Sequence, residues 1–600
     1  MSVLPRRILE AGLWIAALGV PLAWSDRFYA EYVLPKFVIL NLGVLIAALG
    51  FALGAAAGEF RVRRTVMDIP ILGFGAALAL ACARSVDPIL SAIGHYNEYT
   101  HGLWGLALFV SVYFLAVWGL EETGRRRLLA VSVAAAALVG AYAVLQALGF
   151  EPFPRVGRLP EGRAVSFIGS PVFLGAYLAT AAPLALHIAV KGKCRRLWTL
   201  PALLFVCAGL IATVSRGAML AGGLACAMYI WLGREKRPLR LSRAQRAAAV
   251  LLLGLLVLAA GSLVMKRSAA SKAHGSPRVE LWSMAWRSFL SHPLTGSGPD
   301  TFEIDFRRNR SAEMVRLRSV NEFQIHAHND VMQILATMGI VGFAAYLAAL
   351  AALLLLGWRI VGREERRGGV ELASLAAVSA LFIVVKFNPP HISALALGAL
   401  CVGLCSAPGK RERCEGAGGI RSTAIACILL LCAMGSGWLA GRLTLADYYF
   451  KLALAHEKAG NHAPALENFQ AAVRLNRCEL EYRRTTVNHL ITRAYDPAER
   501  RSATDMLDKA FAQARTARGC RPLDMHSHYI YGVAALMQAQ AGRLDKLADA
   551  ETALDEGLRL DPLFAPLARA RERAARLRGD AVAAESYGQR AAYLESLFQG

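Results

Sequence analysis

Apolar residues fill long, nearly uninterrupted runs through residues 1–442, and an amphipathic pattern replaces these runs in the rest of the chain. Most runs are long enough, or nearly long enough, to cross a hydrocarbon layer of about 30 Å as a helix. The pattern predicts an all-α protein, with a polytopic membrane domain at 1–442 and a soluble helical domain at 443–594. The candidate spans, about thirteen, are 8–24, 33–55, 67–83, 102–119, 127–148, 171–190, 197–213, 217–232, 247–265, 331–357, 370–387, 391–406 and 422–440.

The C-terminal domain repeats a helix–turn–helix pattern with a period of about 34 residues. In the first unit Gly460 falls at the turn, and Ala465, Phe469 and Ala472 fall where paired helices need close contact. Further units occupy 489–516, 531–562 and 569–594. The units resemble tetratricopeptide repeats, which stack into an α-solenoid that binds peptides or proteins. The alternative is a helical cap that only stabilises the membrane domain. Residues 595–600 resemble the remnant of an expression tag.

The net charge of +23 is concentrated in the loops between candidate spans. Basic residues cluster at 61–64, 125–127, 191–196, 234–246, 359–367 and 410–421. These clusters occupy every second loop, as the positive-inside rule requires of cytoplasmic loops in an inner-membrane protein. The distribution argues against nucleic-acid binding, and it predicts that the remaining loops and the C-terminal domain lie on the periplasmic side.

The longest outer loop, 266–330, is basic, although basic residues are disfavoured on that side of the membrane. Arg216 lies between two apolar runs without a basic neighbour. An ionisable side chain at membrane depth is expensive and indicates function, the alternative being an ion pair that holds helices together. The polar residues that gather on the outer face as candidate site residues are Arg163, Arg216, Arg278, His326, His328 and Asn329.

His326 and His328 end the long loop, directly before an apolar run. Both side chains face one side if this segment is extended, whereas they diverge in a helix. A lone histidine at a helix start is more often a structural residue with a hydrogen-bond partner. Facing guanidinium groups, however, an imidazole suits group transfer from a phosphate-activated donor, because it is a base near neutral pH and guanidinium binds phosphate bidentately. The sequence has no metal-ligand spacing, and we expect neither a metal nor another cofactor.

The pair His328-Asn329, followed after nine residues by Gly339-Ile340-Val341-Gly342, resembles a signature of the bacterial O-antigen ligase and O-antigen polymerase superfamily. Further elements occur in that family's order: Arg163 before Ser-Phe-Ile-Gly-Ser-Pro, Ser215-Arg216-Gly217, and Arg278 through Pro293 and Gly296-Ser297-Gly298 to Phe302. The resemblance covers roughly residues 70–405. Ser170 stands where the family often has asparagine, so no role is assigned to it.

The resemblance implies a GT-C-like membrane fold of about 12–13 transmembrane helices. It also implies metal-independent transfer of a glycan from undecaprenyl diphosphate to an acceptor hydroxyl at the periplasmic face. Carried over residue by residue, it makes His328 the general base, lets Asn329 hold the histidine ring or the acceptor, and leaves His326 to orient the site. The residues that it assigns to the diphosphate are Arg216, Arg163 and Arg278.

The resemblance leaves the acceptor open. Lipid A core is the first expectation, and polymerisation of repeat units or O-linked glycosylation of a protein are the alternatives. The C-terminal domain hints at a protein partner, because it is not needed to attach sugar to lipid. A transporter of the lipid-linked glycan is a further alternative, since arginines in its cavity would also bind diphosphate. Cys478 and Cys520, the two cysteines of the C-terminal domain, can pair if that domain lies in an oxidising periplasm.

Overall fold

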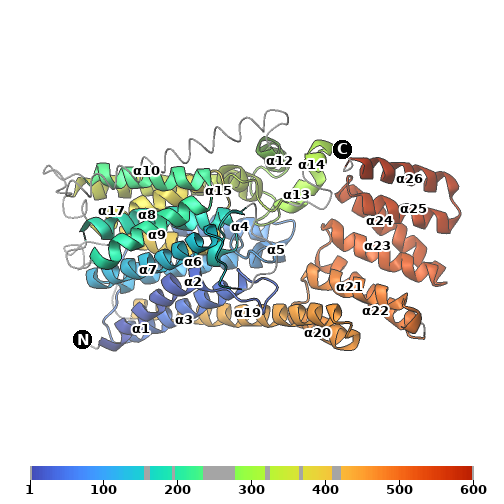
Figure 1. Ribbon diagram of the computed structural model, residues 1–600, viewed down its shortest axis with the longest axis horizontal. Helices are drawn as coiled ribbons and strands as arrows, with labels where there is room; N and C mark the ends of the chain where they lie inside the picture. Colours follow the sequence, from blue (N-terminus) through green and yellow to red (C-terminus); the bar gives the residue numbers. More distant parts are fainter. Residues whose placement is uncertain are drawn as a thin grey trace.

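The computed structural model describes residues 3–153, 162–191, 196–233, 277–317, 324–363, 369–407, 420–499 and 501–597. Every regular element in these ranges is a helix. The helices form two regions that follow each other along the long axis of the molecule: a bundle of apolar helices and a stack of shorter amphipathic ones (Figure 1). The prediction of a helical membrane protein is confirmed at this level.

Five helices of the described ranges are long and apolar enough to cross a membrane. They are α3 (Leu34–Ala56), α7 (Glu122–Ala147), α8 (Pro171–Lys191), α15 (Asp330–Gly362) and α19 (Ile420–Lys458). Each overlaps one of the candidate spans. The last helix differs from its span in one respect: α19 runs without a break through position 442, where the sequence pattern sets the boundary between the two domains.

The other candidate spans within the described ranges form shorter or broken helices. Six are apolar helices: α4 (Asp68–Ala83), α6 (Leu103–Gly119), α9 (Arg196–Ala212), α10 (Arg216–Leu232), α17 (Val370–Val384) and α18 (Ile392–Ser406). The first span is divided into α1 (Val3–Trp14), the π-helical turn η1 (Ile15–Gly19) and α2 (Val20–Leu22). The span predicted at 247–265 lies outside the described residues.

Small residues bring the apolar helices into backbone contact. A Cβ atom on Gly12 of α1 would lie 2.4 Å from the backbone nitrogen of Ala47 in α3, and one on Gly50 would lie 2.4 Å from that of Leu9. At such close approach, dispersion contacts between the backbones hold the helices together. The hydrophobic effect does not do so within a membrane, because lipid chains are as apolar as the side chains. The interior therefore depends on glycine at these crossings.

Ion pairs gather at the end of the bundle that lies away from the C-terminal domain. Arg125 lies 2.9 Å from Glu371, Arg127 lies 3.5 Å from Glu10, and Arg6 lies 2.8 Å from Glu121. These residues belong to α1, α7 and α17 or to the turns beside them. The predicted alternation of loops puts these segments on one side of the membrane. The ion pairs likewise bring them together at one end of the bundle.

The described part of the long loop folds into three helices: α12 (Pro277–Ser291), α13 (Phe302–Asn309) and α14 (Ala312–Leu317). Before them in the chain, the short helix α5 (Pro88–Ile93) belongs to another loop at the same end. Buried side chains of α12 and α13, including Leu281 and Phe302, pack against Ala336 of α15. The described part of the long loop is thus a folded part of the bundle.

The C-terminal region consists of α20 (His462–Leu475), α21 (Leu480–Ala494), α22 (Ala503–Cys520), α23 (Met525–Gln540), α24 (Leu547–Leu560), α25 (Ala565–Arg578) and α26 (Ala581–Ser596). Consecutive helices pack in pairs, beginning with α19 and α20, and the pairs stack side by side (Figure 1). Gly460 makes the first turn with φ of 77°, and Ala465 and Phe469 are fully buried between the helices.

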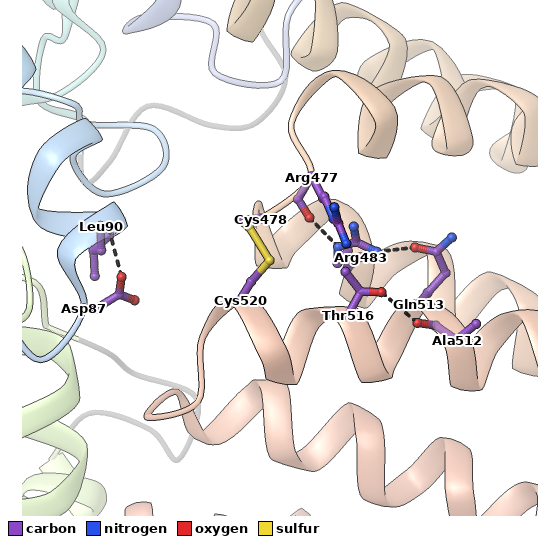
Figure 2. Close-up of a disulfide and its surroundings, with 9 residues drawn as sticks. All are labelled: Asp87, Leu90, Arg477, Cys478, Arg483, Ala512, Gln513, Thr516 and Cys520. Atoms are coloured by element: carbon purple, nitrogen blue, oxygen red, sulfur yellow. Dashed lines mark hydrogen bonds between the residues drawn. A yellow bond between two sulfur atoms is a disulfide. The ribbon is translucent and has the colours of Figure 1, made fainter.

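A disulfide joins Cys478, just before α21, to Cys520 at the end of α22 (Figure 2). It fixes the ends of the second helix pair at the side that faces the bundle, with the α5 turn carrying Asp87 across from it. The pairing that the sequence allowed for an oxidising compartment is present.

Buried carboxylates attach the C-terminal region to the bundle. Asp447 of α19 is fully buried and accepts hydrogen bonds from the backbone nitrogens of Tyr29 (2.7 Å) and Ala30 (3.1 Å) and from the hydroxyl of Tyr482 (3.2 Å). Asp561, also fully buried, lies 2.8 Å from Arg310 of the long loop. The two regions therefore form one packed structure.

Candidate functional site

Asn329 is the residue directly before α15, at the end of the segment that carries His326 and His328. Its Oδ1 accepts hydrogen bonds from the backbone nitrogens of Val331 (3.0 Å) and Met332 (3.2 Å), which makes it the N-cap of the helix. Its Nδ2 donates to the carbonyl oxygen of Lys386 at 3.3 Å. The asparagine side chain thus ties the start of α15 to the turn that follows α17, and its contacts in the structure are with the backbone.

His328 precedes this cap with φ of 53°, in the left-handed region. Non-glycine residues rarely adopt this conformation, and it gathers at functional sites where surrounding contacts enforce it. The side chain is half-buried, and Nε2 lies 3.2 Å from Oε1 of Gln324. The amide oxygen of Gln324 accepts this hydrogen bond and so helps to orient the imidazole ring.

Lys386 and Asp330 lock the same junction from the side. Lys386 Nζ lies 2.7 Å from Oδ2 and 2.8 Å from Oδ1 of Asp330, and the hydroxyl of Tyr346 donates to Oδ2 at 2.6 Å. The ammonium group also lies 3.8 Å from the ring centre of Phe382. This cluster was not singled out by the sequence analysis. The signal was present, because Lys386 and Asp330 are ionisable residues next to apolar runs, as Arg216 is.

Arg163 and Arg216 meet at the turn between α9 and α10. Arg216 is the first residue of α10, and Arg163 Nε donates to the carbonyl oxygen of Thr213 at 2.9 Å. The backbone supports this arrangement, because Ala164 donates to the carbonyl of Ala212 at 3.1 Å. Val214 has φ of 52°, which is unusual for a β-branched residue. Two segments that are separate in the sequence thereby place Arg163 and the first residue of α10 at one turn.

The turn after α17 links these arginines to the histidine segment. A Cβ atom on Gly217 would lie 3.4 Å from Cβ of Phe387 and 3.7 Å from Nδ2 of Asn388. The preceding residue, Lys386, receives the hydrogen bond from Asn329. The start of α10 and the start of α15 therefore pack on the same four-residue turn, 385–388, which we call the shared turn.

Arg278 is the candidate that the structure does not join to the shared turn. It is the second residue of α12 and is exposed, and it forms no hydrogen bond or ion pair within the described ranges. Residues 266–276, which precede it in the same loop, lie outside the described residues. Arg278 stays on the surface of the folded loop, beyond the α12 side chains that pack against α15.

His326 is buried and pairs with a carboxylate that sequence reasoning missed. Its Nε2 lies 2.6 Å from Oε2 of Glu98, and its ring contacts that of His101 edge-on with centroids 4.6 Å apart. Burial works to lower the pKa of His326, but the Glu98 carboxylate outweighs it and the pKa is raised. Burial works to raise the pKa of Glu98, but the charge of His326 outweighs burial and lowers this pKa to about 2. Each group of the pair therefore favours the charged form of the other.

One nitrogen from each histidine and one Glu98 oxygen lie within 4.8 Å of one another, a spacing that a metal ion can bridge. The short hydrogen bond between Glu98 and His326 already satisfies both groups as an ion pair. The pKa of His101 is lowered by burial and then by the charge of His326. The Nε2 of His101 is buried without a hydrogen-bond partner within the described ranges, so the ion pair satisfies His326 and Glu98 but not this ring.

The glycines of the His-Asn-x9-Gly-x-x-Gly signature have a structural explanation. Gly339 interrupts α15 with φ of 61°, and the freed backbone nitrogens of Ile340 and Val341 donate to the carbonyls of Pro293 (2.9 Å) and Leu294 (3.2 Å). A Cβ atom on Gly296 would lie 2.1 Å from the backbone of Thr337. Two glycine-rich elements of the sequence thus dock against each other and fix the long loop on the helix that begins at the histidine segment.

A cavity of about 530 Å³ lies between this end of the bundle and the C-terminal region. On the bundle side its wall includes Glu98 and Ile325, the latter next to His326. Glu479, Arg484 and Arg521 form part of the opposite wall. None of the six candidate residues lines it, so the cavity adjoins the histidine segment without containing the arginines of the α9–α10 turn.

Comparison with curated proteins gave no match. The O-antigen ligase family matches residues 201–347, a quarter of the chain that begins in α9, passes through the long loop and ends in α15. This segment contains Arg216, Arg278, His326, His328 and Asn329, whereas Arg163 lies before it. Together with the apolar helices, the match supports an O-antigen ligase-type membrane glycosyltransferase.

Proposed function

We propose that the protein transfers a glycan from undecaprenyl diphosphate to an acceptor hydroxyl, with lipid A core as the acceptor. The observation that carries the proposal is the shared turn, 385–388, on which the starts of α10 and α15 both pack. Arg216 and His328 are the residues at or beside these two helix starts, and both lie in the segment that matches the ligase family.

In the proposed reaction His328 takes the proton of the acceptor hydroxyl as its oxygen attacks the anomeric carbon of the donor. The bond between that carbon and the phosphate oxygen breaks, and its electron pair leaves with the diphosphate. Arg216 and Arg163 bind the diphosphate and stabilise the negative charge as it leaves, as guanidinium groups do in other phosphate-activated transfers. Each of these steps uses a side chain of this protein and needs no metal.

The neighbouring residues are proposed to position this machinery. Asn329 holds the start of α15 through its cap and its hydrogen bond to Lys386, in place of the direct contact with the ring or the acceptor that the resemblance suggested. His326, paired with Glu98, fixes the segment on the other side of His328. Arg278 is a proposed outer contact for the diphosphate, reached from the surface of α12.

We further propose that this face is periplasmic and that the C-terminal region is a tetratricopeptide-type solenoid in that compartment. The disulfide between Cys478 and Cys520 supports the assignment, because such bonds persist in the periplasm and are rare in the cytoplasm. The positive-inside pattern of the basic loops supports the same orientation within the inner membrane.

The test uses the full-length protein in lipid nanodiscs with undecaprenyl-diphosphate oligosaccharide as donor. Lipid A core, a second donor molecule and a pilin-like protein are offered separately, so that the product distinguishes a ligase, a polymerase and a protein glycosyltransferase. We expect product with lipid A core. In His328→Ala the rate should fall by about 10²–10⁴-fold with donor binding retained, as expected for loss of a general base. Arg216→Ala should weaken donor binding.

Arg559→Ala is the matched control, because Arg559 is an exposed arginine of α24 that pairs only with Glu556 within the described ranges. Full transfer by His328→Ala would overturn the assignment of the base. Movement of the lipid-linked glycan across the bilayer without any transfer product would instead support a transporter.

A further inference from the structure

We infer that the cavity between the bundle and the C-terminal region binds the saccharide part of the acceptor. This inference rests on the proposed function and extends it to the substrate that receives the glycan. It gives the C-terminal region a direct part in substrate recognition, through side chains that complete the wall of the cavity.

The cavity is formed by both parts of the chain and has the size of a small-molecule site. Its volume of about 530 Å³ falls within the range of about 300–1,000 Å³ that is usual for such sites. The bundle supplies loop residues at 29–33 and 95–98, and the C-terminal region supplies the first residues of α21 and α23 with the turns before them. Neither part alone encloses the space.

Aromatic rings with fixed positions line the bundle side. Tyr29 is 42% exposed and stacks on Tyr96, with ring centroids 6.3 Å apart and an interplanar angle of 15°. The backbone of Tyr29 is held by Asp447, so the ring is presented at a fixed place. Phe173 adds a third ring, stacked on His391 at 4.9 Å. Flat aromatic faces with a polar edge suit the mixed apolar and hydroxyl surface of a sugar ring.

The charge of the lining argues against a diphosphate as the occupant. The carboxylates of the lining are Glu31, Glu98, Glu303, Glu479, Glu481 and Asp524, and the guanidinium groups are Arg307, Arg484 and Arg521. Six carboxylates against three guanidinium groups and His95, whose pKa its contact with Glu303 raises to about 9, leave an excess of negative charge that would repel a group with two or more negative charges. Carboxylates accept hydrogen bonds from hydroxyls and guanidinium groups donate to them, which is the polar pattern that a neutral saccharide requires.

Arg521 is the residue that points most directly to a ligand. Its Nε is buried and has no hydrogen-bond partner within the described ranges. Glu479 and Asp524 attract it electrostatically, yet their carboxylates are used as N-caps of α21 and α23. A buried donor without a partner is costly, so a hydroxyl-bearing ligand that accepts from Arg521 would stabilise the arrangement.

The position of the cavity favours the acceptor saccharide over the donor saccharide. The cavity adjoins Glu98 and Ile325, and His328 lies three positions after Ile325 in the chain. Arg163 and Arg216, which are proposed to hold the donor diphosphate, do not line it. A saccharide seated there would lie beside the histidine segment without occupying the place proposed for the diphosphate, as a separate acceptor requires.

The experiment measures transfer kinetics in nanodiscs with donor and acceptor varied separately. Arg521→Ala and Arg484→Ala should each raise the KM for the acceptor about tenfold or more, the usual effect of losing a hydrogen bond from a charged group, with the KM for the donor unchanged. Tyr29→Ala should act in the same direction, whereas Tyr29→Phe should keep the wild-type KM because the ring face remains. Arg559→Ala is again the matched control.

Arg484 has a side chain that is 40% exposed and pairs with Glu481 on its own helix, so its truncation keeps the fold even if Arg521→Ala does not. Unchanged KM values in Arg484→Ala and Tyr29→Ala, or a rise confined to the donor, would overturn the inference while leaving the proposed transfer intact.

A second measurement stands apart from activity. Saturation-transfer NMR on the intact protein should detect binding of the lipid-free core oligosaccharide and its loss in Arg521→Ala and Arg484→Ala. Binding of a pilin-derived peptide in its place, with no binding of the oligosaccharide, would contradict the inference. Because this assay needs no donor, it tests the cavity even if the protein transfers no glycan.

Discussion

His326 Nε2 and Glu98 Oε2 lie 2.6 Å apart, although 228 positions separate the two residues in the chain. The ion pair joins the loop before α6 to the segment that carries His328, and both partners are largely buried. One histidine of the segment is thus engaged in a buried ion pair, and the other is the proposed base.

The different surroundings of the two histidines predict unequal effects of their substitution on stability. His326→Ala should lower the free energy of unfolding by about 3 kcal/mol, because it leaves the Glu98 carboxylate buried without its partner. His328→Ala should change it by less than about 1 kcal/mol, since that ring is only half-buried. Thermal unfolding followed by intrinsic fluorescence in detergent measures both. Equal unfolding midpoints for His326→Ala and wild type would contradict the assigned ion pair.

The ion pair between Lys386 and Asp330 predicts that substitutions of these two residues have coupled effects. Lys386→Met leaves the Asp330 carboxylate with the hydroxyl of Tyr346 and the backbone nitrogen of Val331 but without a cation, and it loosens the shared turn on which both helix starts rest. We expect glycan transfer to fall at least tenfold and the unfolding free energy to fall by about 1–3 kcal/mol. A double-mutant cycle with Asp330→Asn should show that the two losses are not additive. Strict additivity would show that the residues act independently.

The pair of His95 and Glu303 predicts a loss of stability at alkaline pH. Burial lowers the pKa of His95, but its hydrogen bond to Glu303 and the charge of that carboxylate raise it to about 9. Because the folded pKa exceeds the unfolded value, the stabilisation is fully present below about pH 6.5 and is lost as pH rises through about 9. Unfolding midpoints from pH 6 to 10 should show a decline worth about 3 kcal/mol. His95→Gln, which cannot titrate, should be less stable at pH 6 and show a smaller decline, and an identical profile would refute the assignment.

The disulfide predicts the compartment and the stability of the C-terminal region. Cys478 and Cys520 are 42 positions apart, and closing a loop of this length stabilises the folded state by up to about 4 kcal/mol in the chain-entropy account. Cys478→Ser should therefore lower the unfolding midpoint, whereas Cys427→Ser, at an exposed free cysteine of α19, should not. Alkylation of intact cells followed by mass spectrometry should find Cys478 and Cys520 protected from the alkylating reagent. Two reactive thiols there would place the domain in a reducing compartment.

The helices could be predicted from the sequence because each is a local pattern of apolar positions. The five long spans and the repeat turn at Gly460 follow from such patterns, and their residues lie near the predicted positions. Span lengths were less predictable. The first span breaks at a π-helical turn, and several others are shorter than a bilayer-crossing helix, because their packing inside the bundle depends on partners elsewhere in the chain.

The site was predictable only in part for the same reason. Arg216 and His328 could be singled out as candidates because an ionisable group beside an apolar run is visible locally. Glu98 carries no such signal, and its link to His326 exists only after the loops have folded together. Local sequence also could not separate the two histidines. Their difference lies in burial and in the carboxylate that faces only one of them.

The continuous helix α19 sets how far the C-terminal region can move. With 39 residues and a rise of about 1.5 Å per residue, it extends about 58 Å from the bundle into the first helix pair, with no flexible linker between them. Adding one residue to it would turn everything beyond by about 100°, carrying Asp447 away from Tyr29 and the cavity wall out of register. The helix is therefore a rigid spacer, and both its length and its rotation about its axis are fixed. The size of the acceptor cavity depends on these two quantities.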